Sequence, residues 1–268
     1  MKVVIFCGGL GTRLRDSGGS NLPKPLVRIG YRPVLWHVMK YYAHFGHKDF
    51  ILCLGKAADL IKEYFLTYSE WVTNNFTLTD GGKTIELETN DIKDWRITFV
   101  DTGQRASVGQ RLKAVKSYLG NDEVFLANYA DGLTDLDLPR QLEAFFESRK
   151  VACFLAVKPS QSFHVVRHDE NNLVKDIRFV RDSDVIINGG YFVFRRSIFD
   201  YIGDGEDLVI EPFARLIRDR QLLAYPYDNF WCMDTFKDQA ELTEMYERGN
   251  PPWAVWRNDG RRTILSAT

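Results

Sequence analysis

The sequence predicts an α/β protein with a doubly wound, mostly parallel sheet, because buried strand-like runs alternate with helix-like segments. Val3 to Phe6 is a continuous apolar run that ends in glycines, which is typical of a strand buried on both faces. Apolar residues then recur at helical spacing over 34–45, and a second apolar run follows at Phe50 to Leu54. This strand–helix–strand order predicts parallel strands joined by right-handed crossovers.

The same alternation continues along the chain. Further helices are predicted at 61–68, 112–119 and 138–146, and further strands at 95–100, 124–129 and 151–157. A last helix around Leu242 should end at Gly249, two residues before a pair of prolines.

Two stretches interrupt this rhythm. Residues 69–95 form a predicted insertion in which Phe76 to Leu87 is a β-hairpin turning at Asp80-Gly81-Gly82-Lys83. Because a projecting hairpin buries little by itself, we expect an oligomer arm, with an active-site flap as the alternative. Residues 160–194 are predicted to add antiparallel strands beside the sheet. We therefore expect one domain over 1–257 and a tail at 258–268.

The composition excludes several classes of protein. The chain has 268 residues, of which 45% are hydrophobic and 26% charged, so it is an ordinary globular chain. Its 35 basic and 36 acidic residues give a net charge of −1, which predicts no general attraction to nucleic acid or to an anionic membrane. No apolar run approaches the roughly 20 residues of a membrane span, and the N-terminal run is too short for a secretory signal. Four scattered cysteines without a Cys-x-x-Cys pair predict buried thiols in a reducing compartment, the cytoplasm.

A glycine-rich loop follows the first predicted strand and reads Gly8-Gly9-Leu10-Gly11-Thr12-Arg13. At the carboxyl end of a parallel strand, backbone without Cβ atoms lets N–H groups approach phosphate oxygens, and Arg13 adds a cation. Leu14 stands where a dinucleotide-binding fingerprint needs glycine, and no Gly-Lys-Ser/Thr follows as in a P-loop. The loop predicts a phosphate site of another type, with a ligand-free turn as the alternative.

Lys24 lies between two prolines, Pro23 and Pro25. Flanking prolines restrict the backbone, so the lysine is held on a stiff segment and loses less entropy when it meets a phosphate. A surface turn with a solvated lysine is the alternative.

Two aspartates follow apolar runs. Asp131 comes after the strand predicted at 124–129, and Asp234 comes after Phe230-Trp231-Cys232-Met233. Carboxylate oxygens suit Mg²⁺, which proteins hold with one or two carboxylates together with substrate phosphates. A turn residue at Asp131 and a helix cap at Asp234 are the alternatives.

Several motifs occur in the order found in one family. They are the glycine loop, the Pro-Lys-Pro segment, Gly30-Tyr31-Arg32-Pro33-Val34-Leu35, Val100-Asp101-Thr102-Gly103, Asp131-Gly132, Ile187-Asn188-Gly189-Gly190-Tyr191-Phe192, Met233-Asp234-Thr235 and Pro252-Trp253. From Met1 to about Arg257, the chain resembles the sugar-1-phosphate nucleotidyltransferases, and within them the cytidylyltransferase branch.

The resemblance implies a reaction and its site. CTP would transfer its nucleotidyl group to glucose 1-phosphate or a related sugar 1-phosphate, releasing pyrophosphate. Arg13 would hold the triphosphate, Lys24 the region of the α-phosphate, and Asp131 and Asp234 a Mg²⁺ ion. The alternatives are dTTP or UTP as donor, another sugar or polyol phosphate as acceptor, and a catalytically silent subunit that senses nucleotide or sugar.

The remaining candidate residues divide between the two substrates. On the nucleotide side, Gly109 and Arg111 resemble the family's base-reading segment. The alternative is a helix start with a solvated arginine. Ala130 stands where relatives have glycine, and this small residue could let a flat ring lie against the backbone, provided that its φ is negative. On the sugar-phosphate side we expect His164, Arg178, Arg181, Asn188, Gly189 and Glu211. The alternatives are a strand histidine on a polar face for His164 and a helix start for Glu211. The family's Glu-Lys-Pro segment is absent, so Arg178 or Arg181 would replace its lysine, although arginine is no neutral substitute.

Overall fold

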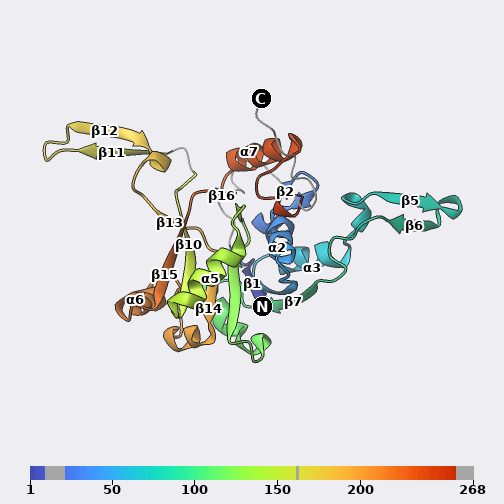
Figure 1. Ribbon diagram of the computed structural model, residues 1–268, viewed down its shortest axis with the longest axis horizontal. Helices are drawn as coiled ribbons and strands as arrows, with labels where there is room; N and C mark the ends of the chain where they lie inside the picture. Colours follow the sequence, from blue (N-terminus) through green and yellow to red (C-terminus); the bar gives the residue numbers. More distant parts are fainter. Residues whose placement is uncertain (10–21, 161–162, 258–268) are drawn as a thin grey trace.

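The central sheet has eight strands, seen near the middle of the computed structural model in Figure 1, which describes residues 1–9, 22–160 and 163–257. Seven strands follow the order β13-β10-β14-β8-β1-β4-β7, and β15 pairs with β10. The strands are β1 (Lys2–Phe6), β4 (Asp49–Leu54), β7 (Arg96–Asp101), β8 (Val124–Tyr129), β10 (Ala152–Val157), β13 (Ile187–Asn188), β14 (Phe192–Arg195) and β15 (Leu222–Tyr227).

Most neighbouring strands of this sheet run parallel. β1 is parallel to β4 and β8, β4 to β7, and β10 to β15, whereas β14 is antiparallel to both β8 and β10. The predicted mostly parallel sheet with antiparallel additions is therefore confirmed. Because parallel strands end at the same edge, the segments that follow β1 and β8 meet there.

Helices cover both faces of the sheet. Alternate residues of β1 contribute to different cores: Val3 and Ile5 pack in one buried cluster, and Val4 and Phe6 in the other. The two faces are thus both apolar, which is the physical requirement for a doubly wound sheet. The helices are α2 (Val34–His44), α3 (Ala58–Leu66), α4 (Val108–Ala114), α5 (Leu138–Ser148), α6 (Glu211–Arg218) and α7 (Phe236–Glu247), with 3-10 turns η1 (Lys24–Leu26), η2 (Glu70–Val72), η3 (Asp80–Gly82), η4 (Lys116–Leu119), η5 (Val180–Asp182), η6 (Arg196–Tyr201) and η7 (Val255–Arg257).

Two helices have boundaries that differ from the prediction, and the helix expected over 61–68 is α3, which begins three residues earlier and ends two residues earlier. The helix expected over 112–119 begins earlier, at Val108, because the Ser107 side chain caps it by accepting the Gln110 N–H. It then gives way to the 3-10 turn η4. The apolar spacing located the buried face but not the capped first turn, which lies beside the predicted site.

The predicted hairpin within 69–95 is confirmed and projects from the body of the molecule (Figure 1). It consists of β5 (Phe76–Thr79) and β6 (Thr84–Leu87), which pair Phe76 with Leu87 and Leu78 with Ile85. Alternation along a strand places these four apolar side chains on one face and threonines with Glu86 on the other.

A second hairpin corrects the expectation for 160–194. β11 (His164–His168) and β12 (Val174–Phe179) pair only with each other and project on the side opposite to β5 and β6 (Figure 1). Of the strands described in this stretch, β13 and β14 alone join the sheet. β10, the strand that precedes this stretch, already pairs with β15 on one side and with β13 and β14 on the other. The hairpin therefore cannot pair with β10.

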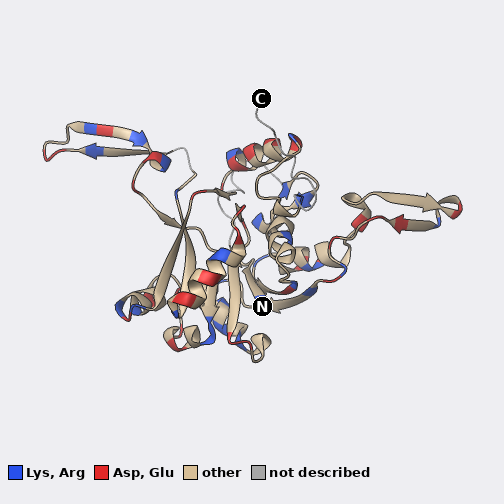
Figure 2. Cartoon of the chain, viewed as in Figure 1, with Lys and Arg blue, Asp and Glu red and all other residues tan. Residues whose placement is uncertain are grey.

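Charges of both signs are interspersed over the helices and hairpins (Figure 2). This distribution agrees with the near-zero net charge of the sequence. Within the described ranges, no helix combines the length and the apolarity that a membrane span requires. Two further short ladders complete the fold: β2 (Arg28–Ile29) with β3 (Arg32–Pro33), and β9 (Gly132–Thr134) with β16 (Phe230–Cys232).

A buried ion pair ties the base of the β5–β6 hairpin to the body. The Arg32 guanidinium lies 3.3 Å from an Asp91 carboxylate oxygen, and the two side chains are only 4% and 8% exposed. The hydroxyls of Tyr68 and Thr73 also donate to Asp91. The Lys40 ammonium lies 3.4 Å from the other Asp91 oxygen. Two cations and these hydrogen bonds therefore compensate the carboxylate, whose burial would otherwise be costly.

We predict that Arg32→Met lowers the free energy of unfolding by about 2 to 3 kcal/mol, because the buried Asp91 carboxylate loses the more deeply buried of its two cations and keeps only Lys40. Urea unfolding at neutral pH measures this loss. Lys48→Met, which breaks the exposed ion pair with Asp94, is the matched control and should cost at most about 1 kcal/mol. Equal losses in the two variants would show that the buried pair does not anchor the hairpin.

Candidate active site

A short antiparallel ladder brings the two predicted metal-binding aspartates together. Asp131 follows β8 and directly precedes β9, whose Gly132 pairs with Cys232 of β16. The Met233 N–H then donates to the Asp131 carbonyl at 3.0 Å. Asp234 is the next residue, so the ladder places both carboxylates at one edge of the sheet.

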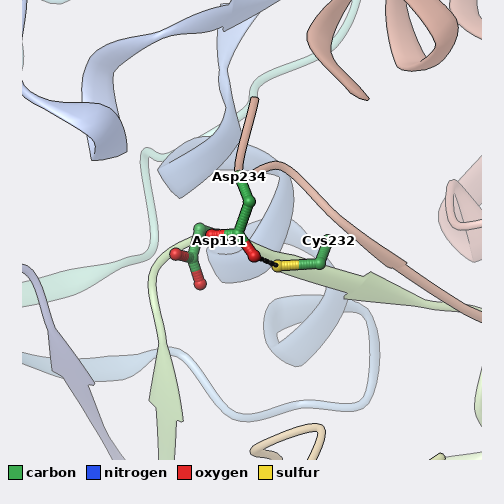
Figure 3. A group of neighbouring side chains, drawn as sticks. All are labelled: Asp131, Cys232 and Asp234. Atoms are coloured by element: carbon green, nitrogen blue, oxygen red, sulfur yellow. Dashed lines mark hydrogen bonds between the residues drawn. The ribbon is translucent and has the colours of Figure 1, made fainter. Parts of the chain in front are cut away.

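The side chains of Asp131, Cys232 and Asp234 lie close together (Figure 3). One oxygen or sulfur atom from each lies within 4.8 Å of the others, a spacing that could hold a metal ion. The Cys232 thiol donates to Asp234 at 3.4 Å. Burial first, and the two carboxylates second, raise the pKa of this thiol above its ordinary range. It therefore stays protonated unless a metal displaces the proton.

The sequence analysis does not predict Cys232 as a member of this group, because it interprets the cysteines only as buried apolar residues. That interpretation holds for Cys7, Cys53 and Cys153, which are buried, whereas Cys232 is half-buried. One signal was available in the sequence: residues two apart in an extended chain point to the same side. Cys232 and Asp234 have this spacing.

The cap proposed as an alternative for Asp234 belongs to its neighbour. Thr235 is the N-cap of α7, where its side chain accepts the Asp238 N–H in a capping box. The Asp238 carboxylate in turn accepts the backbone N–H groups of Asp234 and Thr235. The helix start is satisfied without the Asp234 carboxylate, which is left to face Lys24.

Lys24 places its ammonium between the two aspartates. Its Nζ atom lies 2.6 Å from an Asp131 oxygen and also forms an ion pair with Asp234. The lysine begins the 3-10 turn η1, which is capped by Pro23 in an extended conformation. The side chain is 19% exposed, so the alternative of a solvated lysine is wrong.

The charge state of Lys24 follows from these contacts. Burial opposes the charged ammonium, but the Coulombic attraction of Asp131 and the hydrogen bonds to both carboxylates outweigh it. The pKa of Lys24 is therefore raised above its ordinary value, and the side chain is a permanent cation at neutral pH. A pair of carboxylates that already holds one cation fits the charge and ligand preference of a divalent ion such as Mg²⁺.

A cavity of about 700 Å³ opens beside this cluster, a size typical of small-molecule sites. Its described lining includes six of the predicted site residues: Gly8, Gly9, Lys24, Arg111, Ala130 and Asp131. The backbone at Ala130 has no positive φ, so alanine is tolerated where relatives have glycine. Leu10, Gly11, Thr12 and Arg13 lie outside the described residues.

Arg111 is a buried side chain that supports the backbone of Gly8, the first residue of the glycine loop. It is 4% exposed, and its guanidinium donates to the Gly8 carbonyl at 2.9 Å, the Leu54 carbonyl at 3.0 Å and the Thr102 hydroxyl at 2.7 Å. A Cβ atom on Gly8 would lie 2.1 Å from this guanidinium. The alternative of a solvated arginine is therefore wrong, and three of its donor groups already serve the protein itself.

Gly109 allows a close approach between two backbones. A Cβ atom there would lie 2.7 Å from the Glu206 carbonyl and 3.1 Å from the Leu208 nitrogen. The Ser107 hydroxyl and the Gln110 amide both donate to the same Glu206 carbonyl. These contacts hold the start of α4 against the loop that carries Asp207, another residue lining the cavity.

The predicted sugar-phosphate residues separate into two groups. Gly189 lies near Gly132, the residue after Asp131, because a Cβ atom on Gly132 would be 3.8 Å from the Gly189 carbonyl, and Asn188 precedes Gly189 in β13. Glu211 begins α6, where its carboxylate accepts the Asp207 N–H at 3.2 Å.

The second group lies on the β11–β12 hairpin and the turn that follows it. Arg178 forms an ion pair with Asp176, and the His164 ring lies 4.4 Å from that of Phe179. The Arg181 guanidinium lies over the same phenylalanine at 5.2 Å. Among the described residues lining the cavity, none of the six sugar-phosphate candidates of either group occurs.

Residues 2–238 match the sequence profile of the nucleotidyl transferase family, and the chain belongs to this family. It is 37% identical over 259 residues to the "Probable glucose-1-phosphate cytidylyltransferase" of Bacillus subtilis (strain 168), covering 96% of this chain and 100% of that relative. The glucose-1-phosphate cytidylyltransferase of Salmonella typhi is 36% identical over 258 residues, with coverages of 96% and 100%. HddC from Yersinia pseudotuberculosis complexed with GMP-PN shares the fold, with a TM-score of 0.65 at 21% identity and coverages of 91% and 99%. The family predicted from the motifs is confirmed, and the chain is a sugar-1-phosphate nucleotidyltransferase.

We predict that Arg111→Met lowers the free energy of unfolding by about 2 to 4 kcal/mol and weakens nucleotide binding, because the Gly8 and Leu54 carbonyls lose a charged donor. Urea unfolding and calorimetric titration with nucleotide measure the two effects. Arg105→Met is the control, since Arg105 lines the same cavity but is exposed. It should change the free energy of unfolding by no more than about 0.5 kcal/mol. Unchanged stability of Arg111→Met would contradict the supporting role.

Proposed function

We propose that the enzyme transfers the cytidylyl group of CTP to glucose 1-phosphate, giving CDP-glucose and pyrophosphate. The observation that carries this proposal is the meeting of Asp131, Asp234 and Lys24 beside a cavity whose lining includes Gly8 and Gly9. The two cytidylyltransferase relatives, matched over their whole length, support CTP and glucose 1-phosphate as the substrates.

The acceptor needs no general base in this reaction. A phosphate monoester has a second pKa near 6, so its attacking oxygen is already ionised at neutral pH. The remaining difficulty is to bring two anions together in line. The protein must therefore position the phosphates and neutralise their charge.

We assign these tasks to residues at the edge of the sheet. The backbone N–H groups at Gly8 and Gly9 would hold phosphate oxygens, and the Lys24 ammonium would meet the α-phosphate. Arg13 remains a proposed triphosphate ligand. Asp131 and Asp234 would hold Mg²⁺, which when bound neutralises charge on the reacting phosphates.

The base and sugar sites follow from the same geometry. Ala130 leaves room in the cavity wall for a flat pyrimidine ring, while Arg111 would act through the glycine loop and Gly109 through the position of α4. On the sugar side we retain Asn188 and Gly189, the second of which lies near Gly132, together with Glu211. His164, Arg178 and Arg181 remain candidates on a hairpin whose described contacts are with its own neighbours.

A pyrophosphate-release assay tests the proposal directly. CTP, dTTP, UTP and GTP should be supplied in turn, each with glucose 1-phosphate, another sugar 1-phosphate and a polyol phosphate. We expect the highest kcat/KM for CTP with glucose 1-phosphate. If CTP performs no better than its competitors, the cytidylyl assignment is wrong. Nucleotide binding without any pyrophosphate would instead indicate a silent, nucleotide-sensing subunit.

In the same assay, we predict that Asp131→Asn and Asp234→Asn each lower kcat by about a hundredfold or more, because each removes a charged ligand from the site of phosphate neutralisation. Asp228→Asn is the matched control, since it removes an exposed carboxylate from the connection between β15 and β16. It should retain the activity of the unaltered enzyme. Full activity of either site variant would overturn the proposed metal role.

We also propose that the enzyme is a cytoplasmic homo-oligomer joined through the β5–β6 hairpin. The apolar face of this hairpin leaves Phe76, Leu78 and Ile85 42%, 56% and 50% exposed. Contiguous apolar surface of this kind is typical of protein interfaces. The cytoplasm agrees with four cysteines that form no disulfide.

We predict that Leu78→Asp combined with Ile85→Asp reduces the mass of the assembly in light scattering, because it places charges on the paired apolar positions of the hairpin. Thr77→Asp combined with Glu86→Asp is the control, since these residues occupy the opposite face of the same two strands. An unchanged mass in the first variant would remove the hairpin from the interface.

A further inference from the structure

The Lys24 ammonium stands where a cation shared by Asp131 and Asp234 would stand. It contacts one oxygen of each carboxylate, and these residues, together with Cys232, form the group whose ligand atoms lie within 4.8 Å of one another. The lysine thus satisfies the same carboxylates that the proposed function gives to the metal ion. One set of oxygens has two candidate cations.

The two cations cannot both keep these contacts without a cost. Two carboxylates carry a charge of about −2, and the ammonium already neutralises half of it. A divalent ion placed on the same oxygens would lie at ion-pair distance from the ammonium, where like charges repel and the partly buried setting screens them little. Metal binding is therefore opposed as long as Lys24 stays between the carboxylates.

The structure provides a direction in which Lys24 can leave. Pro23 and Pro25 fix its backbone in η1, whereas its four-carbon side chain can pivot about that fixed point. Lys24 also lines the cavity beside the glycine loop, on the side where the proposed function places the phosphates. If the Lys24 ammonium moved into the cavity, it would leave the two carboxylates and pair with phosphate oxygens instead. The ammonium would therefore remain paired with negative charge.

We infer that Lys24 is a built-in counter-ion that occupies the metal position in the free enzyme and moves to the nucleotide phosphates when metal and nucleotide bind together. This inference rests on the proposed function and adds a rule for its order of binding. The free enzyme should hold a divalent ion weakly, and nucleotide should strengthen that binding by removing the lysine from the carboxylates. The lysine would thereby couple metal loading to the presence of the phosphates.

Binding of Mn²⁺ without nucleotide tests the inference and does not depend on activity. Free Mn²⁺ can be followed by electron paramagnetic resonance as each variant is titrated. We expect Lys24→Met, which removes the charge, to bind Mn²⁺ roughly ten- to hundredfold more tightly than the unaltered enzyme, within the usual range of coupling between sites. Lys24→Arg keeps the charge and should bind as weakly as the unaltered enzyme.

Two further variants locate the effect and guard against misfolding. Asp234→Asn in the Lys24→Met background should abolish the gain, whereas a gain that persists would place the ion elsewhere and overturn the inference. Lys24→Gln repeats the test with a neutral amide that can still donate to a carboxylate, should the methionine variant not fold. Thermal unfolding confirms that the compared variants are folded.

The outcomes separate the inference from the proposed function. Suppose that the unaltered enzyme binds Mn²⁺ in the presence of CTP, but that the neutral variants bind Mn²⁺ no more tightly than the unaltered enzyme without nucleotide. This result would overturn the displacement of Lys24 and leave the metal site intact. Absence of Mn²⁺ binding even with CTP would reject the metal site itself, and the inference with it.

Discussion

The ion pairs of Lys24 with Asp131 and Asp234 are the interaction on which the site depends. Two carboxylates this close repel each other unless a cation lies between them, so the ladder of β9 with β16 and the position of η1 have to be compatible. The antiparallel pairing of Gly132 with Cys232 places Met233 next to Asp131. Asp234, the next residue, is thereby brought close to Asp131, and Lys24 of η1 lies between the two carboxylates. The rest of the site is arranged around this charge cluster.

The sheet supplies the other half of the site. Its parallel strands end at one edge, where the glycine loop follows β1 and Asp131 follows β8. Arg111 stabilises that edge, because its guanidinium donates hydrogen bonds to the Gly8 carbonyl, the Leu54 carbonyl and the Thr102 hydroxyl. A buried cation next to Gly8 both fixes the backbone there and adds positive potential to the place where phosphates are proposed to bind.

Local patterns were sufficient to predict β1, β4, β7, β8 and β10, most helices and the β5–β6 hairpin, because apolar periodicity and turn residues report local burial and local chain reversal. The sheet strand β15 was not predicted. The ordered motifs identified the family and singled out Asp131, Asp234 and Lys24. The roles of Arg111 and Cys232 were not predicted, since both depend on partners from distant strands. The detachment of β11 and β12 was also missed, because alternation predicts a strand but not the edge that it pairs with.

The central claim is that Asp131 and Asp234 share one cation at a phosphate-binding edge of the sheet. Crystals soaked with CTP and Mn²⁺, measured for the anomalous scattering of manganese, test it most directly. The account predicts an anomalous peak within coordination distance of both carboxylates and of the triphosphate, with the Lys24 ammonium on a phosphate oxygen. A manganese ion bound by only one of the aspartates, or a triphosphate seated away from the glycine loop, would contradict it.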